Sequence, residues 1–357
     1  MPHPQNHSGS VRIAIIAEDL RLPLDEGAKK ATFCLLESFP RVGVRGAIFT
    51  RYKNPYLKNR YTLPANRLLL GWQFIHDLRQ EAPDVILYIP SSSFTMGAFV
   101  RASIIKVLSA GKPLALLSTQ YRKLPASARY FRLRQSIDLV LTQSPASEEV
   151  SRSLGWKTLL LHSGVDNTIF HPVSEQYRCQ LRSEYGYMPD DHIILHVGHG
   201  NRRRNVHSLS RFTDAGYKVI LITSTSTTTD AELLSQLRAS GVFVIDTYQE
   251  HIQHYYQIAD CYIFPVLDAT AAIDIPLSVL EAMACNLPVV TTRYGGLPAM
   301  FQHGNGFYYA DAEEDMLRMV KYAIDMKNCK TIEMVAQYTW DNFASSILNA
   351  LWTIHHQ

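Results

Sequence analysis

Strand-like and helix-like segments alternate along almost the whole chain of 357 residues, and this alternation restricts the fold more than any other feature. Several segments are nearly continuous runs of Val, Ile and Leu, which is typical of parallel strands covered by helices on both faces. Helices are expected between them, for example over residues 26–38, 70–81 and 96–110. The strands expected in a first parallel sheet are residues 11–17, 44–50, 84–90, 113–119, 138–144 and 157–163.

A second series of strands follows a turn-rich stretch, GVDNTIFHP at residues 164–172, which has no hydrophobic period. Two such series predict an α/β fold with two Rossmann-like domains that face each other across a cleft. The predicted domains are residues 1–165 and 166–339, and a last helix over about 340–357 is expected to pack back onto the first. The strands expected in the second sheet are residues 192–198, 217–223, 241–247, 260–266 and 287–292.

Length and composition agree with a globular protein of two domains, since hydrophobic residues make up 46% and charged residues 19%. No apolar run approaches the roughly 20 residues of a membrane-spanning helix. The polar start MPHPQNHSGS lacks the apolar core of a signal peptide. Five scattered cysteines without a Cys-x-x-Cys pair predict reduced thiols and no zinc site, so a cytoplasmic protein without a metal is expected.

The charge is distributed unevenly. Residues 1–165 contain 22 Lys and Arg against 11 Asp and Glu, whereas residues 166–357 contain 13 against 21. A basic half favours an anionic partner, such as a lipid surface, a phosphorylated carrier or an acidic glycan. The alternative is a solvated basic surface without a partner, and charge alone leaves both interpretations open.

The segment DIPLSVLEAMACNLPVVTTRYGG, residues 274–296, gives the clearest indication of a binding site. It predicts a loop, a helix that starts near Pro276 and Ser278, a buried strand and a Gly-Gly turn. A helix start at the carboxyl edge of a sheet offers backbone amides to an anion. The phosphates of a nucleotide are therefore expected at Pro276, Leu277 and Ser278. Glu281, one turn further on, can accept hydrogen bonds from the paired hydroxyls of its ribose.

Two further loops contain candidate anion ligands. In VGHGNRRRNV, Gly198 permits a tight turn after a strand, and Arg204 is the preferred phosphate ligand because a guanidinium can bind phosphate bidentately. Arg203 and His199 are additional candidates, although a histidine is mostly neutral at pH 7 unless an anion raises its pKa. The alternative for this loop is a solvated basic turn.

The loop EDLRLPLDEGAKKAT precedes the first expected helix, and Gly27 at its end lets a ligand approach the backbone closely. Simple capping of that helix by Asp25 is an equally good interpretation of the loop.

Residues 274–296 resemble the donor-binding signature of retaining glycosyltransferases with the GT-B fold, especially the large family 4. That signature has an acid, seven residues, a second acid, Ala-Met-Ala, Pro-Val-Val and Gly-Gly. Glu281 matches the second acid, and the resemblance assigns it the ribose, whereas Ile273 stands where the first acid is expected. Either Asp274 takes that role from one residue further on, or the contact with the sugar is changed.

The resemblance extends to other positions. It implies that Arg204 and His199 stand where the family has two cations on the donor phosphates, and that Gly27 lies near the diphosphate. It also places the base of the nucleotide near Tyr248, which either stacks on it or is a surface tyrosine. The family histidine after the fourth strand is replaced by STQYRKL, which leaves Gln120 and Arg122 as candidates on the acceptor side.

The sequence therefore predicts a glycosyltransferase, specifically a hexosyltransferase, that acts in polysaccharide biosynthesis. The expected reaction moves a sugar from a UDP- or GDP-sugar to a glycan or lipid-linked acceptor, with retention and without metal or cofactor. Arg204, Asp274 and Glu281 are the residues expected to take part in transfer. Partners are the donor, the acceptor and an anionic surface at the inner face of a membrane, not nucleic acid. Alternatives are a nucleotide-sugar epimerase on the same fold, or a degenerate protein that binds a nucleotide sugar without turnover.

Overall fold

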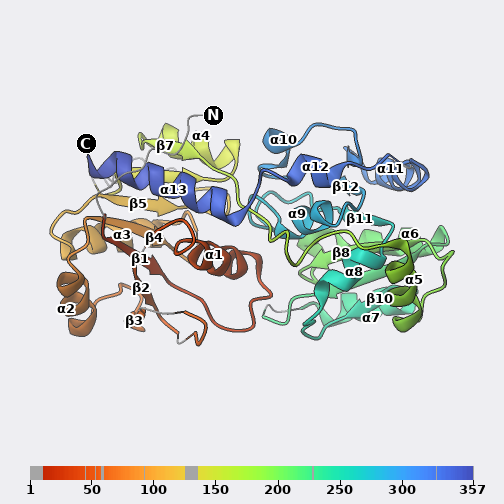
Figure 1. The fold of residues 1–357 in the computed structure, drawn as a ribbon, viewed down its shortest axis with the longest axis horizontal. Helices are drawn as coiled ribbons and strands as arrows, with labels where there is room; N and C mark the ends of the chain where they lie inside the picture. The colour runs from red at the N-terminus through yellow and green to blue at the C-terminus, as the bar shows by residue number, and fades with distance from the viewer. Residues whose placement is uncertain are drawn as a thin grey trace.

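The computed structural model describes residues 11–44, 46–52, 54–57, 60–91, 93–124, 136–226, 229–326 and 328–356. Two parallel sheets, each with helices on both faces, form two domains that lie side by side (Figure 1). The predicted fold class is confirmed. None of the helices in the described ranges is both long enough and apolar enough to cross a bilayer.

The first sheet has seven parallel strands in the order β3-β2-β1-β4-β5-β6-β7. In the middle of it, Ile13 lies opposite both Gly46 and Val85. Buried side chains alternate between two faces, so that Ile15 packs toward α1 and α13 while Ile16 packs toward α2 and α3. The strands are β1 (Ile13–Ala17), β2 (Gly46–Thr50), β3 (Arg60–Thr62), β4 (Val85–Ile89), β5 (Leu114–Leu117), β6 (Leu139–Thr142) and β7 (Thr158–Leu160). The helices of this half are α1 (Gly27–Ser38), α2 (Trp72–Glu81), α3 (Met96–Leu108) and α4 (Pro145–Ser153).

The second sheet has six parallel strands in the order β10-β9-β8-β11-β12-β13. Its strands are β8 (Ile193–Gly198), β9 (Lys218–Thr223), β10 (Phe243–Ile245), β11 (Cys261–Phe264), β12 (Val289–Thr291) and β13 (Phe307–Tyr309). The α-helices of this half are α5 (Glu175–Glu184), α6 (Ser210–Asp214), α7 (Ala231–Ala239), α8 (Ile252–Ile258), α9 (Leu277–Ala284), α10 (Leu297–Met300), α11 (Glu313–Asp325) and α12 (Thr331–Val335). Two short 3-10 helices, η3 (Arg202–Arg204) and η4 (Val206–Leu209), follow β8.

The sequence missed two strands, β3 and β13. Both are only three residues long, and β3 consists of Arg60, Tyr61 and Thr62 without an apolar run. Each lies at the edge of its sheet. The edge strands β7 and β10 are equally short but were predicted, because each belongs to a longer apolar run. β13 is the buried aromatic segment Phe307–Tyr309, which lacks such a run.

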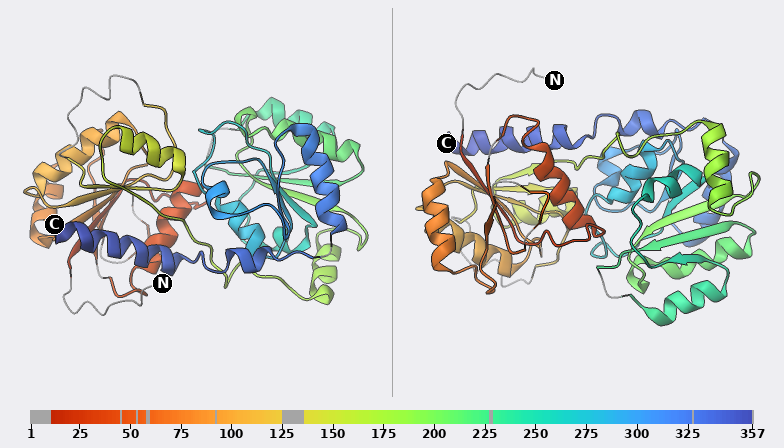
Figure 2. Two further views of the ribbon diagram at one scale, coloured as in Figure 1. Left: turned by 90° about the horizontal axis from the view of Figure 1, so that it is seen from above. Right: turned by 60° about the horizontal axis from the view of Figure 1, so that its bottom comes forward.

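The last helix, α13 (Trp340–His355), returns to the first domain (Figures 1 and 2). Its buried residues Ile347, Leu351 and Ile354 join the core between α1 and the first sheet. Burial of each such side chain contributes about 1.5–3 kcal/mol. The segment that leads into α13 pairs with the linker, because the Val165 amide donates to the Tyr338 carbonyl at 3.0 Å. The linker and the return segment thus cross between the domains next to each other.

The linker and the return segment approach each other closely at Gly164. A Cβ atom at this position would lie 2.2 Å from the carbonyl carbon of Thr339. Only glycine fits such an approach without moving the backbone. This gives a structural reason for the glycine that opens GVDNTIFHP.

Candidate functional site

A cleft of about 340 Å³ lies between the two domains. Its walls come from the start of α1, the linker, and loops of the second domain that follow β8, β9, β10 and β11. Such loops gather at the carboxyl edge of a parallel sheet, where ligands bind in this kind of fold. The predicted donor residues that line the cleft are Gly27, Gly198, His199, Arg204, Tyr248, Pro276, Leu277, Ser278 and Glu281.

The start of α9 forms one end of this wall. The helix begins at Leu277 with Pro276 as its N-cap residue, and no side chain caps it among the described residues. The first amides of a helix lack partners within the helix and can bind an anion. Ser278 does not cap this helix, and its hydroxyl accepts a hydrogen bond from the Tyr262 hydroxyl at 2.7 Å.

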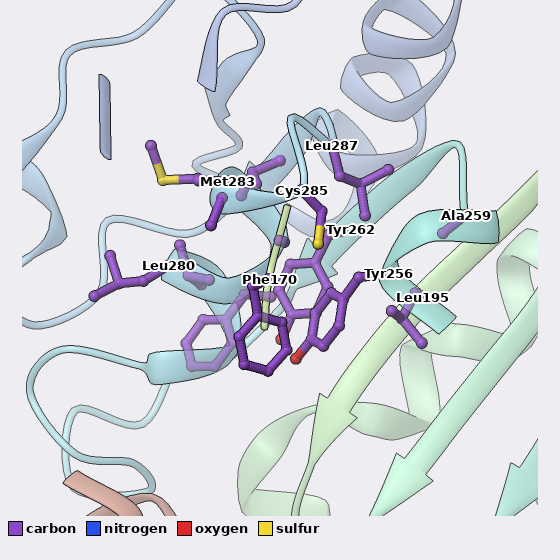
Figure 3. Close-up of a cluster of buried hydrophobic side chains, with 14 of the residues drawn as sticks. Phe170, Leu195, Tyr256, Ala259, Tyr262, Leu280, Met283, Cys285 and Leu287 are labelled. Atoms are coloured by element: carbon purple, nitrogen blue, oxygen red, sulfur yellow. The ribbon is translucent and has the colours of Figure 1, made fainter. Parts of the chain in front are cut away.

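An aromatic and aliphatic cluster holds α9 in place (Figure 3). Leu280 and Met283 on α9 are fully buried in it. The Tyr256 ring lies 5.6 Å from Phe170 of the linker and 5.8 Å from Tyr262 of β11, measured between ring centroids. This packing fixes the direction of Glu281, which comes from the same helix.

Glu281 is nearly enclosed, with 5% of its surface exposed. One carboxylate oxygen accepts a hydrogen bond from the Tyr256 hydroxyl at 2.8 Å. The other lies 2.6 Å from Nζ of Lys30, which belongs to α1 in the first domain. Burial acts to lower the pKa of Lys30, but the Glu281 carboxylate outweighs it and the net shift is upward. A ribose that binds Glu281 must therefore share or displace Lys30.

Arg204 is a buried cation without a counter-charge. Its residue is 8% exposed, and no carboxylate within the described ranges forms an ion pair with it. Burial lowers the pKa of its guanidinium, and Nε has no hydrogen-bond partner there. An unpaired charge of this kind is costly to bury. An anion in the cleft would compensate it.

Two histidines lie beside Arg204. A Cβ atom at Gly198 would lie 3.0 Å from Nε2 of His196 and 3.5 Å from Nη1 of Arg204, so glycine keeps these groups close. Burial lowers the pKa of both His196 and His199 to about 4, and the nearby Arg204 charge acts in the same direction. Both rings are neutral at pH 7. A neutral His199 can bind a phosphate only as a hydrogen-bond donor.

Arg203 does not line the cleft, contrary to its predicted role as a donor ligand. Its guanidinium forms an ion pair with Asp268 at 2.8 Å and a hydrogen bond with Thr270. More than half of the side chain is exposed. The 3-10 turn of η3 separates neighbours by about 120°, which sends Arg203 and Arg204 to different sides.

Asp274 is also absent from the residues that line the cleft, and its role in transfer stays a prediction. One carboxylate oxygen accepts from the Tyr121 amide at 2.6 Å. The other accepts from the hydroxyls of Ser144, at 2.7 Å, and Ser147. All three donors belong to the first domain, so Asp274 joins the domains and has no free oxygen for a sugar. Burial raises its pKa, although these hydrogen bonds act in the opposite direction.

Gln120 and Arg122 join the domains in a similar way. The Gln120 side-chain amide donates to the Thr270 carbonyl of the second domain at 2.8 Å. Its oxygen accepts from Arg122 at 2.8 Å. Neither residue lines the cleft. The structure therefore supports a positioning role and not the contact with an acceptor that was predicted.

Ile273 occupies the position of the expected first acid. It is 8% exposed and packs on Gly27, where an added Cβ atom would lie 3.0 Å from its Cδ1. This part of the cleft is apolar. Tyr248 also lines the cleft, and its side chain is exposed.

The sequence also missed the role of Asp25, which does not cap α1. Its carboxylate accepts hydrogen bonds from the Thr225 amide, at 2.5 Å, and the Thr225 hydroxyl, at 2.6 Å, across the domain boundary. Lys30 and Tyr256, which bind Glu281, were likewise not predicted. Their partners are distant in sequence, so no local pattern indicates them.

Comparison with known proteins connects this geometry to a family. Residues 193–325 match the family model described as glycosyl transferases group 1. The second domain resembles this family. The resemblance predicted from residues 274–296 is thereby confirmed, and the matched range includes Arg204 and Glu281. N-acetyl-alpha-D-glucosaminyl L-malate synthase of Bacillus anthracis is 25% identical over 138 residues, which are 37% of this chain and 35% of that protein.

Solved glycosyltransferase structures share the whole fold. Sucrose-phosphate synthase from Thermosynechococcus elongatus has a TM-score of 0.75 and 16% identity, over 97% of this chain and 99% of that chain. Anabaena Alr3699/HepE, solved with UDP and glucose, has a TM-score of 0.67 and 15% identity, over 97% and 98%. At these identities the likeness establishes the two-domain GT-B fold and not the substrates.

Proposed function

We propose that this chain is a glycosyltransferase that uses a nucleoside-diphosphate sugar as its donor. The observation that carries the proposal is Arg204, a buried unpaired cation in a cleft that also contains Glu281 and the open start of α9. A diphosphate supplies the missing negative charge, and its ribose supplies hydroxyls for Glu281. The group 1 match over residues 193–325 supports the same donor.

In the proposed reaction, the bond between the sugar and the phosphate breaks, a bond from the acceptor oxygen to the sugar forms, and the proton of the acceptor hydroxyl passes to the leaving diphosphate. Negative charge then develops on the leaving diphosphate. Arg204 and the amides at the start of α9 stabilise that charge, and such fixed electrostatic stabilisation is often the largest contribution to catalysis. Retention of configuration and independence from metal are proposed from the resemblance to the family.

The acceptor is proposed to be a glycan or a lipid-linked sugar that approaches the first domain. The excess of Lys and Arg in residues 1–165 supports an anionic surface, and we propose that the protein works at the cytoplasmic face of a membrane. The five cysteines are free thiols in the structure, which suits a reducing compartment.

Thermal unfolding with UDP, GDP, ADP and their sugar conjugates, in the presence of a chelator, tests the donor assignment. A ligand at about 100 times its Kd should raise the Tm of a chain of this size by about 4 °C. The expected result is a response to one base, followed by consumption of its sugar conjugate only when an acceptor is added. UDP is the first choice because Alr3699/HepE was solved with it. No stabilisation by any of these nucleotides would contradict the proposal.

A second candidate function is nucleotide-sugar binding without turnover. Ile273 favours it, because this apolar side chain stands where the family signature has an acid, and Asp274 is engaged elsewhere. The same panel distinguishes the two functions. Stabilisation by a sugar conjugate that no acceptor consumes would indicate the binding protein, and conversion of the conjugate without any acceptor would indicate an epimerase.

A further inference from the structure

Three large apolar side chains of the first domain project into solvent within five residues of sequence. Trp72 is 82% exposed, and Leu68 and Leu70 are each 45% exposed. Single exposed apolar residues are common on proteins, whereas a cluster of them marks an interaction site. We call these three residues the 68–72 surface.

The loop before α2 holds the two leucines outward. The side-chain oxygen of Asn66 accepts hydrogen bonds from the amides of Leu68 and Leu70, both at 3.1 Å. Between them, Leu69 is fully buried and adopts a φ of 58°, which a bulky side chain rarely does. Leu69 is thus the anchor of a fixed turn, and its two neighbours cannot join the core.

Helix α2 extends this surface. Phe74 and Leu78 are buried against the first sheet. Trp72, His76 and Arg79 are spaced four and three residues apart, so they share a solvent-exposed face of the helix. In Figure 1, α2 lies on the side of the first domain that is away from the second domain.

The charges around the 68–72 surface are mostly basic. Residues 51–81 contain six Lys and Arg against two acids, Asp77 and Glu81 of α2. Asp77 is buried and accepts a hydrogen bond from Gln73, and Glu81 accepts one from the Tyr61 hydroxyl. Arg51, Arg60, Arg67 and Arg79 form no ion pair with any residue that the structure describes. Exposed arginines of the second domain differ, because many are neutralised by a neighbouring acid. Examples are Arg203, Arg211, Arg238, Arg293 and Arg318.

We propose that the 68–72 surface and its four arginines dock the protein on an anionic lipid bilayer. Trp72 and the two leucines enter the headgroup region, and the arginines bind lipid phosphates. Interfacial attachment needs this combination of apolar area and positive charge. A second copy of the chain fits less well, because two such surfaces would bring like charges together. This membrane contact rests on the function proposed above. Because the 68–72 surface lies outside the cleft, vesicle binding and nucleotide binding can be lost independently of each other.

Binding to vesicles of phosphatidylcholine, with and without about one quarter phosphatidylglycerol, tests the proposal. Co-sedimentation is expected only with the anionic vesicles at low salt, and added NaCl should weaken it. Tryptophan emission should shift to shorter wavelength on binding. Trp72, which is 82% exposed, should dominate this shift, because Trp156 and Trp340 are buried and Trp352 is partly buried. The shift should therefore be largely lost in Trp72→Ser. Absence of binding to the anionic vesicles at low salt would overturn the proposal.

Paired variants identify the surface. Leu70→Ser with Trp72→Ser should reduce vesicle binding at least about tenfold. Arg67→Glu with Arg79→Glu should reduce it by about 25-fold or more, since each basic residue contributes about fivefold at an anionic surface. The matched controls are Phe243→Ser, which changes an exposed aromatic residue on β10, and Arg211→Glu with Arg318→Glu. Both controls should bind as the unchanged protein does.

Two results would show that the 68–72 surface does not dock on a bilayer. Equal loss of binding in the control variants would show unspecific attraction and overturn the proposal. A dimer in the absence of vesicles that Trp72→Ser abolishes would show that a second copy covers the surface. Each variant should unfold cooperatively at an unchanged Tm without added ligand, which confirms that it is folded whether or not the protein binds a nucleotide.

Discussion

At the scale of single residues, Glu281 shows how the cleft selects a ligand. Its carboxylate is held between Tyr256 on its own domain and Lys30 on the other. Tyr256 and Lys30 each occupy one oxygen of the carboxylate, so a ribose would have to share these oxygens or displace Lys30. In the proposed complex, hydrogen bonds to the ribose hydroxyls would therefore compete with an ion pair between the domains.

This exchange predicts the behaviour of Glu281→Gln. The variant should bind the ribonucleotide about 10–100 times more weakly, because hydrogen bonds to a charged group contribute about 1.5–3 kcal/mol. Its affinity for the 2′,3′-dideoxynucleotide should change much less, since that ligand has no hydroxyl to donate. Titration calorimetry with both ligands measures the difference. An equal loss for the two ligands would assign Glu281 a structural role only.

The two histidines beside Arg204 predict an acid-sensitive fold. Their pKa values of about 4 lie below the 6.5 of a free histidine. As the pH falls, these histidines therefore bind protons at a higher pH in the unfolded chain than in the folded chain. Their effect on the free energy of unfolding is absent above pH 6.5, and this free energy decreases as the pH drops toward 4. Each histidine accounts for up to about 3 kcal/mol of this loss. Urea unfolding of the unchanged protein and of His199→Gln, each at pH 7 and pH 4.5, measures this loss. The free energy of unfolding is expected to fall less between the two pH values in the variant.

At the scale of elements, the Gly-Gly turn at the end of the family signature joins the domains. A Cβ atom at Gly296 would lie 2.3 Å from the carbonyl oxygen of Gln143 in the first domain. Gly295 has a φ of 54°, and a Cβ atom at this position would lie 2.1 Å from the Asp274 carbonyl oxygen. The turn thus brings the second domain against the first behind the cleft.

Gly296→Ala should therefore loosen this contact and lower the free energy of unfolding by about 1–3 kcal/mol. Gly97→Ala, inside α3 and without a backbone clash, is the control and should be neutral or slightly stabilising. Chemical unfolding of both variants provides the measurement. Unchanged stability in Gly296→Ala would show that the two backbones can move apart at no cost.

Elements also show what a sequence can and cannot predict. The eleven strands predicted from apolar runs are present. Most of them, such as β1, β4 and β11, are buried on both faces, which leaves a local signal in the sequence. Arg204 and Glu281 line the cleft as predicted, because each belongs to a local motif next to a strand. The contact of Lys30 with Glu281 was not predicted, since the two residues are 251 positions apart. The contacts of Asp274 with Ser144 and Ser147 were not predicted either, because these serines belong to the other domain.

At the scale of the whole molecule, polar contacts on several sides of the cleft hold the domains together. Asp25, Lys30 and Asp274 each bind a partner in the other domain. Asp274 lies behind the cleft, whereas Asp25 and Lys30 line it. A ligand can therefore exchange the contacts within the cleft while the contact at Asp274 persists.

Asp274→Ala should remove that persistent contact and leave the hydroxyls of Ser144 and Ser147 without their acceptor. The expected result is a larger radius of gyration in solution scattering and a lower Tm. The affinity for a free nucleotide should change little, because Asp274 does not line the cleft. A large loss of nucleotide affinity with an unchanged radius of gyration would show that Asp274 contributes to nucleotide binding.

Calorimetric titration of the preferred nucleoside diphosphate into Arg204→Met and Arg203→Met tests most directly whether the cleft binds a diphosphate. The two residues are neighbours, but only Arg204 is buried and unpaired in the cleft. We expect a loss of affinity of at least about tenfold for Arg204→Met and little change for Arg203→Met. Equal affinity in Arg204→Met and the unchanged protein would contradict the assignment of the cleft to a diphosphate.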